Sequence, residues 1–135
     1  MHYIMSEFLS NYSSADIGFI LLRITVGIIF LYHGIKKFPM WKTKPSDKMK
    51  LSMLLLLRLA FLMECIGGIA MVSGYYVEFA ALGFIGVMLG ALYFKLFMWK
   101  APFSGNNGWE LDLILLAASI ALFMNGDLAF MLIGQ

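Results

Sequence analysis

Charged side chains are scarce in this sequence of 135 residues. Only 13% of them are Asp, Glu, Lys or Arg, and 61% are hydrophobic, whereas a globular domain carries about 25% charged residues. A soluble domain of this length has a large surface for its volume and needs a polar coat to cover it. The scarcity therefore excludes an ordinary soluble domain and a disordered chain. Together with a mean hydropathy of +0.85, it indicates a membrane protein.

Cysteine and histidine are almost absent. Cys65 is the single cysteine, which excludes an internal disulfide, a paired-cysteine redox motif and a thiolate metal site. The two histidines, His2 and His33, lie in different segments, so we expect this chain alone to bind no haem or metal. We expect no flavin in this chain either. Nucleic-acid binding is not expected either, because no basic patch lies on a soluble module.

Four long apolar stretches dominate the chain. A bilayer core about 30 Å thick is crossed by about 20 helical residues, and the stretches at about 17–38, 51–73, 79–99 and 109–132 qualify. Proline and glycine turn signals separate them. We predict an all-α fold, a membrane-spanning four-helix bundle with short loops, as a single domain over residues 1–135. The end of the fourth helix stays open, because Asn125-Gly126-Asp127 is either an exit or a kink.

The basic residues lie on one side of these spans. The first connection is rich in lysine, and Lys95 and Lys100 flank the third, whereas the N-terminal segment, the second turn and the C-terminus contain neither Lys nor Arg. The positive-inside rule predicts that the first and third connections are cytoplasmic. Both termini would then lie outside, with the chain in the cytoplasmic membrane.

The N-terminal segment has its own pattern. Its apolar side chains fall on one helical face, and its polar ones point elsewhere, which predicts an amphipathic helix lying at the membrane interface. The apolar face consists of Ile4, Met5, Phe8, Leu9 and Tyr12. A frayed tail is the alternative.

Ionisable residues occur within the predicted spans. Each is costly there, at roughly 2.5–3.5 kcal/mol for Arg or Asp at a helix centre, and should face a partner inside the bundle. Their depths predict a salt bridge between Arg23 and Glu64. A second cluster is expected nearer the cytoplasmic side, made of Arg58, His33, Lys37 and Glu110. Such groups either fix helix register as ion pairs or exchange protons and bind a polar head group.

Glycines mark faces that allow close helix approach. In the first span, Arg23, Gly27, Phe30, Gly34 and Lys37 share one face, with His33 beside it. Gly67-Gly68 in the second span and Gly86-x-x-x-Gly90 in the third, with Gly83 nearby, predict packing inside the bundle and less often a dimer interface.

These residues resemble those of the DoxX family of small four-helix membrane proteins. The resemblance rests on an ordered set of motifs that runs from about Asp16 to the fourth span. The motifs are Arg23-x-x-x-Gly27, Phe30 and His33-Gly34-x-Lys36-Lys37-Phe38, then Glu64-x-x-Gly67-Gly68 and Gly74, then Phe103 and Gly108-Trp109-Glu110. The family is similar to DoxD, the membrane subunit of archaeal thiosulfate:quinone oxidoreductase. Other members are linked to sulfur or oxidative-stress redox systems.

Two functional hypotheses follow. The first is an integral membrane subunit of a quinone-linked redox system, with a membrane quinone as cofactor. In it Glu64, His33 and Glu110 are the predicted catalytic residues, and Arg23, Arg58, Lys36 and Trp109 are the predicted substrate-binding residues. The second is a non-catalytic accessory or assembly subunit of a larger membrane complex. Both expect the lipid bilayer and other membrane subunits as partners, leave a homo-oligomer open, and place any electron carrier outside this chain.

Overall fold

The computed structural model describes residues 1–11 and 14–125, and all of its regular elements there are helical. Three of them are long and apolar enough to cross a membrane: Ala15–Lys36, Leu51–Ser73 and Val77–Met98. The first lies within helix α2 (Ser14–Lys36), and the second is α3 (Leu51–Ser73). The third comprises α4 (Val77–Tyr93) and a short π-helix, η2 (Phe94–Met98).

The fourth helix, α5, spans Glu110–Met124. It begins where a fourth span was predicted and packs against α4 and α2. Its 15 described residues rise by about 22 Å at 1.5 Å each, less than the bilayer core. The remainder of the predicted span, to about residue 132, lies outside the described residues, as do Gly126 and Asp127 of the open helix end.

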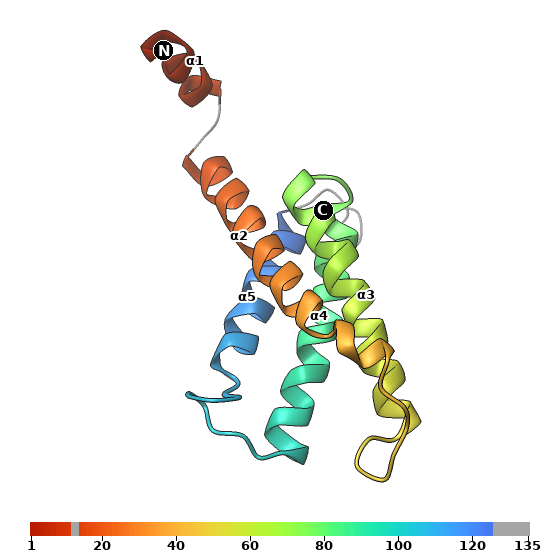
Figure 1. Cartoon of the computed structure of the whole chain (residues 1–135). Coiled ribbons are helices and arrows are strands. Elements are labelled where there is room, and N and C mark those ends of the chain that lie inside the picture. The colour runs from red at the N-terminus through yellow and green to blue at the C-terminus, as the bar shows by residue number, and fades with distance from the viewer. Residues whose placement is uncertain (12–13, 126–135) are drawn as a thin grey trace.

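The N-terminal segment forms α1 (His2–Asn11), which confirms a helix there. Within the described part of the chain, α1 contacts no other helix, and it stands away from the rest in Figure 1. Tyr3 and Ile4 are largely exposed. Its position at a membrane interface stays a prediction.

Helices α2 and α3 form the most extensive pairing in the structure. They approach closely because glycine backbones meet side chains across the contact. A Cβ placed on Gly68 would lie 2.9 Å from the Gly27 carbonyl oxygen and 2.6 Å from Leu31 Cγ. Gly67 packs in the same way against the Phe84 ring of α4. The predicted packing role of Gly67-Gly68 is thus confirmed.

Turn chemistry ends α3. Gly74 adopts φ 86°, the left-handed conformation that favours glycine, and its N–H donates to the Ala70 carbonyl. On the other side of the molecule, a 3₁₀ turn, η1 (Phe38–Trp41), follows α2 and contains Pro39. Arg58 of α3 fastens this connection by donating from Nε to the Met40 carbonyl and from Nη2 to the Thr43 carbonyl.

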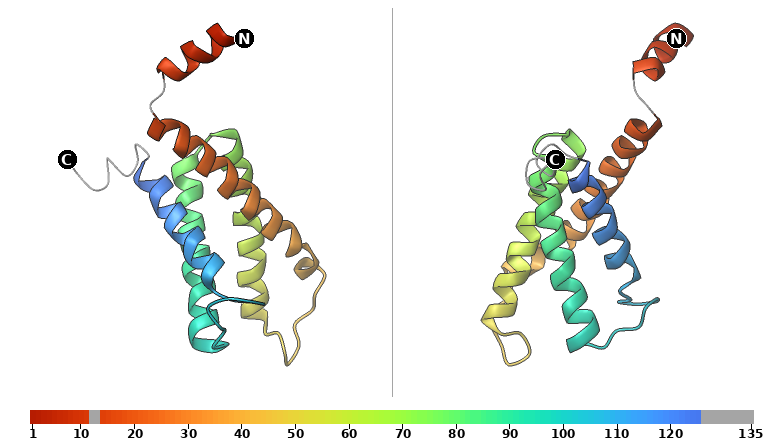
Figure 2. Two further views of the ribbon diagram at one scale, coloured as in Figure 1. Left: turned by 90° about the vertical axis from the view of Figure 1, so that its left-hand side faces the viewer. Right: turned by 180° about the vertical axis from the view of Figure 1, so that it is seen from behind.

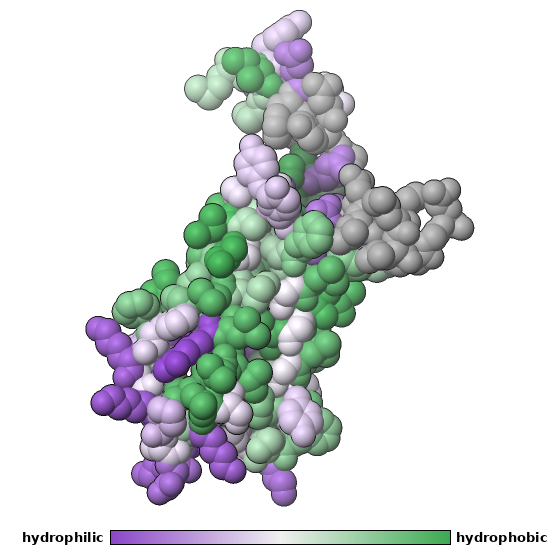
Figure 3. Space-filling view, turned by 90° about the vertical axis from the view of Figure 1, so that its right-hand side faces the viewer, coloured by the Kyte–Doolittle hydropathy of each residue, from purple (hydrophilic) through white to green (hydrophobic). Residues whose placement is uncertain are grey.

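The helices converge at one end and spread apart at the other. In Figures 1 and 2, α3, α4 and α5 lie close together near the α3–α4 turn and diverge toward the opposite end. We call that opposite end, which carries the connections 37–50 and 99–109, the lysine end. Figure 3 shows apolar side chains over the helix surface and hydrophilic ones gathered mainly at the lysine end. Such a surface matches contact with lipid, with the charges at one interface.

The helix core is built around two stacked rings. Phe30 of α2 and Phe84 of α4 are fully buried, with ring centroids 3.7 Å apart and planes 9° from parallel. Val26, Met71 and Leu122 pack in the same cluster. The stack lies where the helices still touch, so it closes the space that opens between them toward the lysine end.

Because α2 and α3 approach closely, an added methyl group should reduce stability at their contact and not at an open position of α2. Gly68→Ala should lower the free energy of unfolding by about 1–3 kcal/mol because the new methyl group meets Gly27 and Leu31. Gly18→Ala is the matched control, since nothing lies within 4 Å of its Cβ position. It should leave stability unchanged or raise it by up to about 1 kcal/mol. Thermal unfolding in detergent micelles measures both, and equal losses would contradict the packing described.

Candidate functional site

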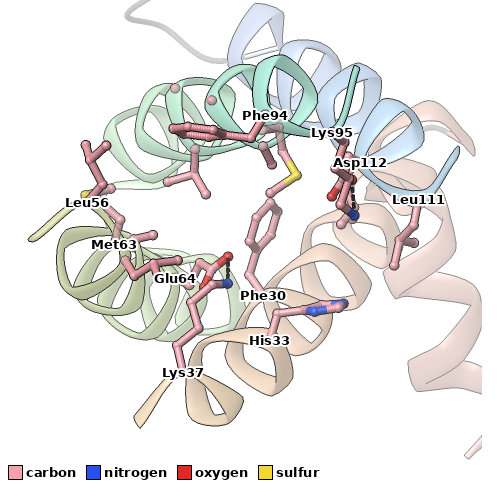
Figure 4. Close-up of a pocket in the computed structure, with 18 of the residues that line it drawn as sticks. Phe30, His33, Lys37, Leu56, Met63, Glu64, Phe94, Lys95, Leu111 and Asp112 are labelled. Atoms are coloured by element: carbon pink, nitrogen blue, oxygen red, sulfur yellow. Dashed lines mark hydrogen bonds and ion pairs between the residues drawn. The ribbon is translucent and has the colours of Figure 1, made fainter. Parts of the chain in front are cut away.

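A cavity of about 730 Å³ lies between the diverging helices. Its walls come from α2, α3, α4, η2, α5 and the loop before α5, and most of the lining side chains are apolar. Phe30 projects into it, as Figure 4 shows, with a polar cluster on either side. The volume falls within the range of about 300–1,000 Å³ typical of sites for small molecules.

The first polar cluster is an ion pair between Lys37 and Glu64. Lys37 Nζ lies 2.6 Å from Glu64 Oε2 and 2.8 Å from Oε1, donating to both oxygens. The Glu64 residue is 1% exposed, whereas the Lys37 side chain is 27% exposed. The carboxylate is therefore satisfied inside the protein, by a cation that reaches it from the lysine end.

The second cluster pairs Lys95 with Asp112. Lys95 Nζ lies 2.6 Å from Asp112 Oδ2 and also donates to the Gly108 carbonyl at 3.2 Å. Lys95 belongs to the π-helix η2, where the Trp99 N–H donates to the Phe94 carbonyl. This wider turn, often found at functional sites, alters the helical register just where Lys95 meets α5.

Asp112 is the acid of this second pair. The residue is 8% exposed and sits in the first turn of α5, where the helix dipole favours an acid. Its Oδ2 is buried, and although Lys95 lies within ion-pair distance, the contact lacks hydrogen-bond geometry. The Lys95 ammonium thus compensates the charge of a nearly buried carboxylate that belongs to the cavity wall.

The expected salt bridge between Arg23 and Glu64 does not form, because Glu64 pairs with Lys37 instead. Arg23 lies beside Gly74, since a Cβ on Gly74 would be 3.1 Å from Arg23 Nη1. A Cβ on Gly34, by contrast, would be 3.1 Å from Glu64 Cβ. Helix α2 therefore starts beyond the end of α3, and Arg23 is level with the α3–α4 turn. The depth estimate was wrong because it assumed that both helices begin at the same height.

The expected second cluster forms only in part. His33, Lys37 and Glu110 all line the cavity. Arg58 does not, because its guanidinium is committed to the connection after α2 and lies 5.7 Å from the Trp41 ring. By donating hydrogen bonds to nearby backbone carbonyls, Arg58 avoids the desolvation cost of burying its charge deep among the helices.

The predicted site residues divide by role. The three predicted catalytic residues, Glu64, His33 and Glu110, line the cavity, and the four predicted binding residues do not. Arg23 and Arg58 lie as described. Lys36 is exposed over the Tyr32 ring at 4.3 Å, and Trp109 packs edge-to-face on Phe103. The chemical roles assigned to all seven stay predictions.

Sequence reasoning missed Lys95 and Asp112 as a pair. Asp112 resembles an ordinary acid in the first turn of a helix, and Lys95 an ordinary cation near a helix end. Their only sequence signal was that both fall near the same side of the membrane. Within the described residues no three His, Cys, Asp or Glu side chains gather as metal ligands would.

The predicted face of α2 is confirmed. Gly27, Phe30 and Gly34 are buried, and Arg23 and Lys37 are half-buried. The packing expected for Gly86 and Gly90 is wrong, because nothing lies within 4 Å of a Cβ at either position. Both glycines line the cavity instead, and only Gly83 of that group packs, against Met63.

The apolar helices, their ion-paired interior and the cavity define a small integral membrane protein with an internal polar site. The sequence profile of the DoxX family matches residues 18–98, more than half of the chain. This chain therefore belongs to the DoxX family. It is 34% identical over 117 residues to the Bacillus subtilis (strain 168) protein named "Putative oxidoreductase CatD", covering 84% of this chain and 83% of that protein. No solved structure gives a significant match.

Removing one partner of the Lys37–Glu64 pair should be costly. Lys37→Met leaves the Glu64 carboxylate buried without a cation and should destabilise the protein by about 3 kcal/mol. The double variant Lys37→Met/Glu64→Gln should recover most of that loss, because the charge is removed with its partner. Chemical unfolding in mixed micelles measures both. The matched control is Lys36→Met, a neighbouring exposed lysine, which should change stability by less than about 1 kcal/mol; an equal effect at both lysines would refute the pair's role.

Proposed function

We propose that this protein is the quinone-binding membrane component of a redox system. The observation that carries the proposal is the cavity itself, whose walls are mostly apolar. Its polar lining consists of two carboxylate–lysine pairs with His33, Asn107 and Glu110. A quinone has the matching chemistry, with a flat apolar ring and carbonyl oxygens that accept hydrogen bonds. The family membership and the printed name of the Bacillus relative support a redox role.

The side chains present suit the proton part of quinone reduction. Taking up two electrons makes each carbonyl oxygen basic, and each then accepts a proton. Lys37 and Lys95 are ammonium donors that can stabilise a developing negative charge, while His33 and the carboxylates can pass protons. Electrons would come from a partner protein or a diffusible donor, since the chemistry of electron transfer belongs to a cofactor. A role with thiosulfate as donor, as in the DoxD resemblance, belongs to this proposal too.

The bundle and its orientation form part of the proposal. We infer that α5 continues into a fourth crossing, with the lysine end in the cytoplasm and both termini outside. The cavity would then lie in the cytoplasmic half of the bilayer, where protons arrive from the cytoplasm. The concentration of lysine at that end is the supporting observation.

The orientation is tested by labelling single cysteines. In a Cys65→Ser background, Tyr75→Cys should react with a membrane-impermeant maleimide in intact cells. Lys44→Cys should react only after the cells are opened, because the reagent cannot cross the bilayer. Both positions are exposed, so access within the protein is matched. Labelling of Lys44→Cys in intact cells would reverse the assignment.

The function is tested by binding and turnover. Purified protein should bind a membrane quinone at about one molecule per chain. Glu64→Gln and Asp112→Asn should each weaken binding or quinone reduction by about tenfold or more, since a hydrogen bond involving a charged group contributes about 1.5–3 kcal/mol. The measurement is quenching of tryptophan fluorescence, followed by quinone reduction in membranes from the native host. Glu78→Gln at the far end of α4 is the control and should leave both values unchanged. Absence of binding would favour the accessory-subunit hypothesis.

A further inference from the structure

The seam between α3 and α4 changes along its length. Near the α3–α4 turn it is sealed, with Phe84 packed on Gly67 and Met63 packed on Gly83. One helical turn closer to the lysine end, Gly86 has nothing within 4 Å of its Cβ position, and neither has Gly90 one turn further. The two helices diverge there (Figures 1 and 2).

The unsealed part of the seam belongs to the cavity. Gly86 and Gly90 line it from α4, and Leu56 and Leu59 line it from α3. Leu56, Leu59 and Gly86 are also exposed, so the cavity reaches the side of the molecule that the spanning helices present to lipid. Its walls there carry no charge. Of the charged lining residues, the acids Glu64 and Asp112 are only 1% and 8% exposed.

We infer that this opening is a lateral portal, in which the isoprenoid tail of a membrane-dissolved quinone rests while its head occupies the polar part of the cavity. The inference rests on the proposed function and adds that the substrate enters from the lipid and keeps its tail there. A cavity that holds two ion pairs and opens through an uncharged, lipid-facing slot matches an amphiphile with a polar ring and a long apolar chain.

The absence of a side chain at Gly86 and Gly90 keeps the opening clear. A side chain at either one would project into the opening, because no protein atom occupies that space. The tail gains little hydrophobic energy on moving from lipid into the seam, since both environments are apolar. The portal therefore contributes space and little binding energy. It lets the head group enter while the tail stays outside the inner cavity.

The test compares menaquinone, which has an isoprenoid tail, with menadione, the same ring without it. Gly86→Leu and Gly90→Leu should each weaken menaquinone binding by about tenfold relative to the unmodified protein. Menadione binding should change by less than about twofold. Both variants should fold, because leucine is a better helix former than glycine and no atom lies within 4 Å of the new Cβ. Gly18→Leu, also in open space but on α2 away from the cavity, is the matched control and should affect neither ligand.

The outcomes separate this inference from the proposed function. Unchanged menaquinone binding in both variants, or an equal loss of menadione binding, would overturn the portal and leave the quinone site standing. Failure of either quinone to bind the unmodified protein would overturn both proposals. A Gly86→Cys variant in the Cys65→Ser background provides a further check. Rapid disulfide dimer formation within the membrane would show that a second copy covers this face, which would also overturn the portal.

Discussion

The buried carboxylate of Glu64 is the constraint on which the rest of the structure depends. A carboxylate that is 1% exposed among apolar helices needs a cation within reach. Lys37 supplies it from just beyond the end of α2, at 2.6 Å. The contact requires α2 to cross α3 so that Gly34 faces Glu64, and the glycine backbones at Gly27 and Gly68 make that crossing close enough. Ion pair and glycine contact thus specify the same helix register.

The same register creates the cavity. Because α2 is tilted across the other helices, it covers them near the α3–α4 turn, where Phe30 stacks on Phe84, and leaves space between them toward the lysine end. Two ion pairs occupy that space from opposite walls, and the π-helix around Lys95 directs one of them toward α5. Each lysine comes from a helix end, where its charge is least costly, and each acid is almost fully buried. The resulting cavity has mostly apolar walls, holds two ion pairs and is uncharged where it meets lipid.

Particular residues show how far the sequence could predict this site. Glu64, His33 and Glu110 were recognised because ionisable groups within apolar spans are costly and conspicuous, and all three line the cavity. Asp112 was missed because an acid in the first turn of a helix has an ordinary explanation. Arg23 was paired wrongly, since depth along a single helix says nothing about tilt or about where its neighbour ends. Gly86 and Gly90 have the spacing of packing glycines, yet no atom fills the space beside them.

Sequence patterns alone predict that the chain is helical and membrane-embedded, which face of α2 is buried, and which end carries the lysines. These properties follow from composition, helical periodicity and the cost of charge in lipid, all of which act on neighbouring residues. The folded arrangement of the helices is needed to see which acid meets which lysine, which glycines pack, which glycines leave an opening, and that a cavity exists at all. Those features depend on how helices distant in sequence cross and on their relative heights. Local sequence patterns carry no information about either.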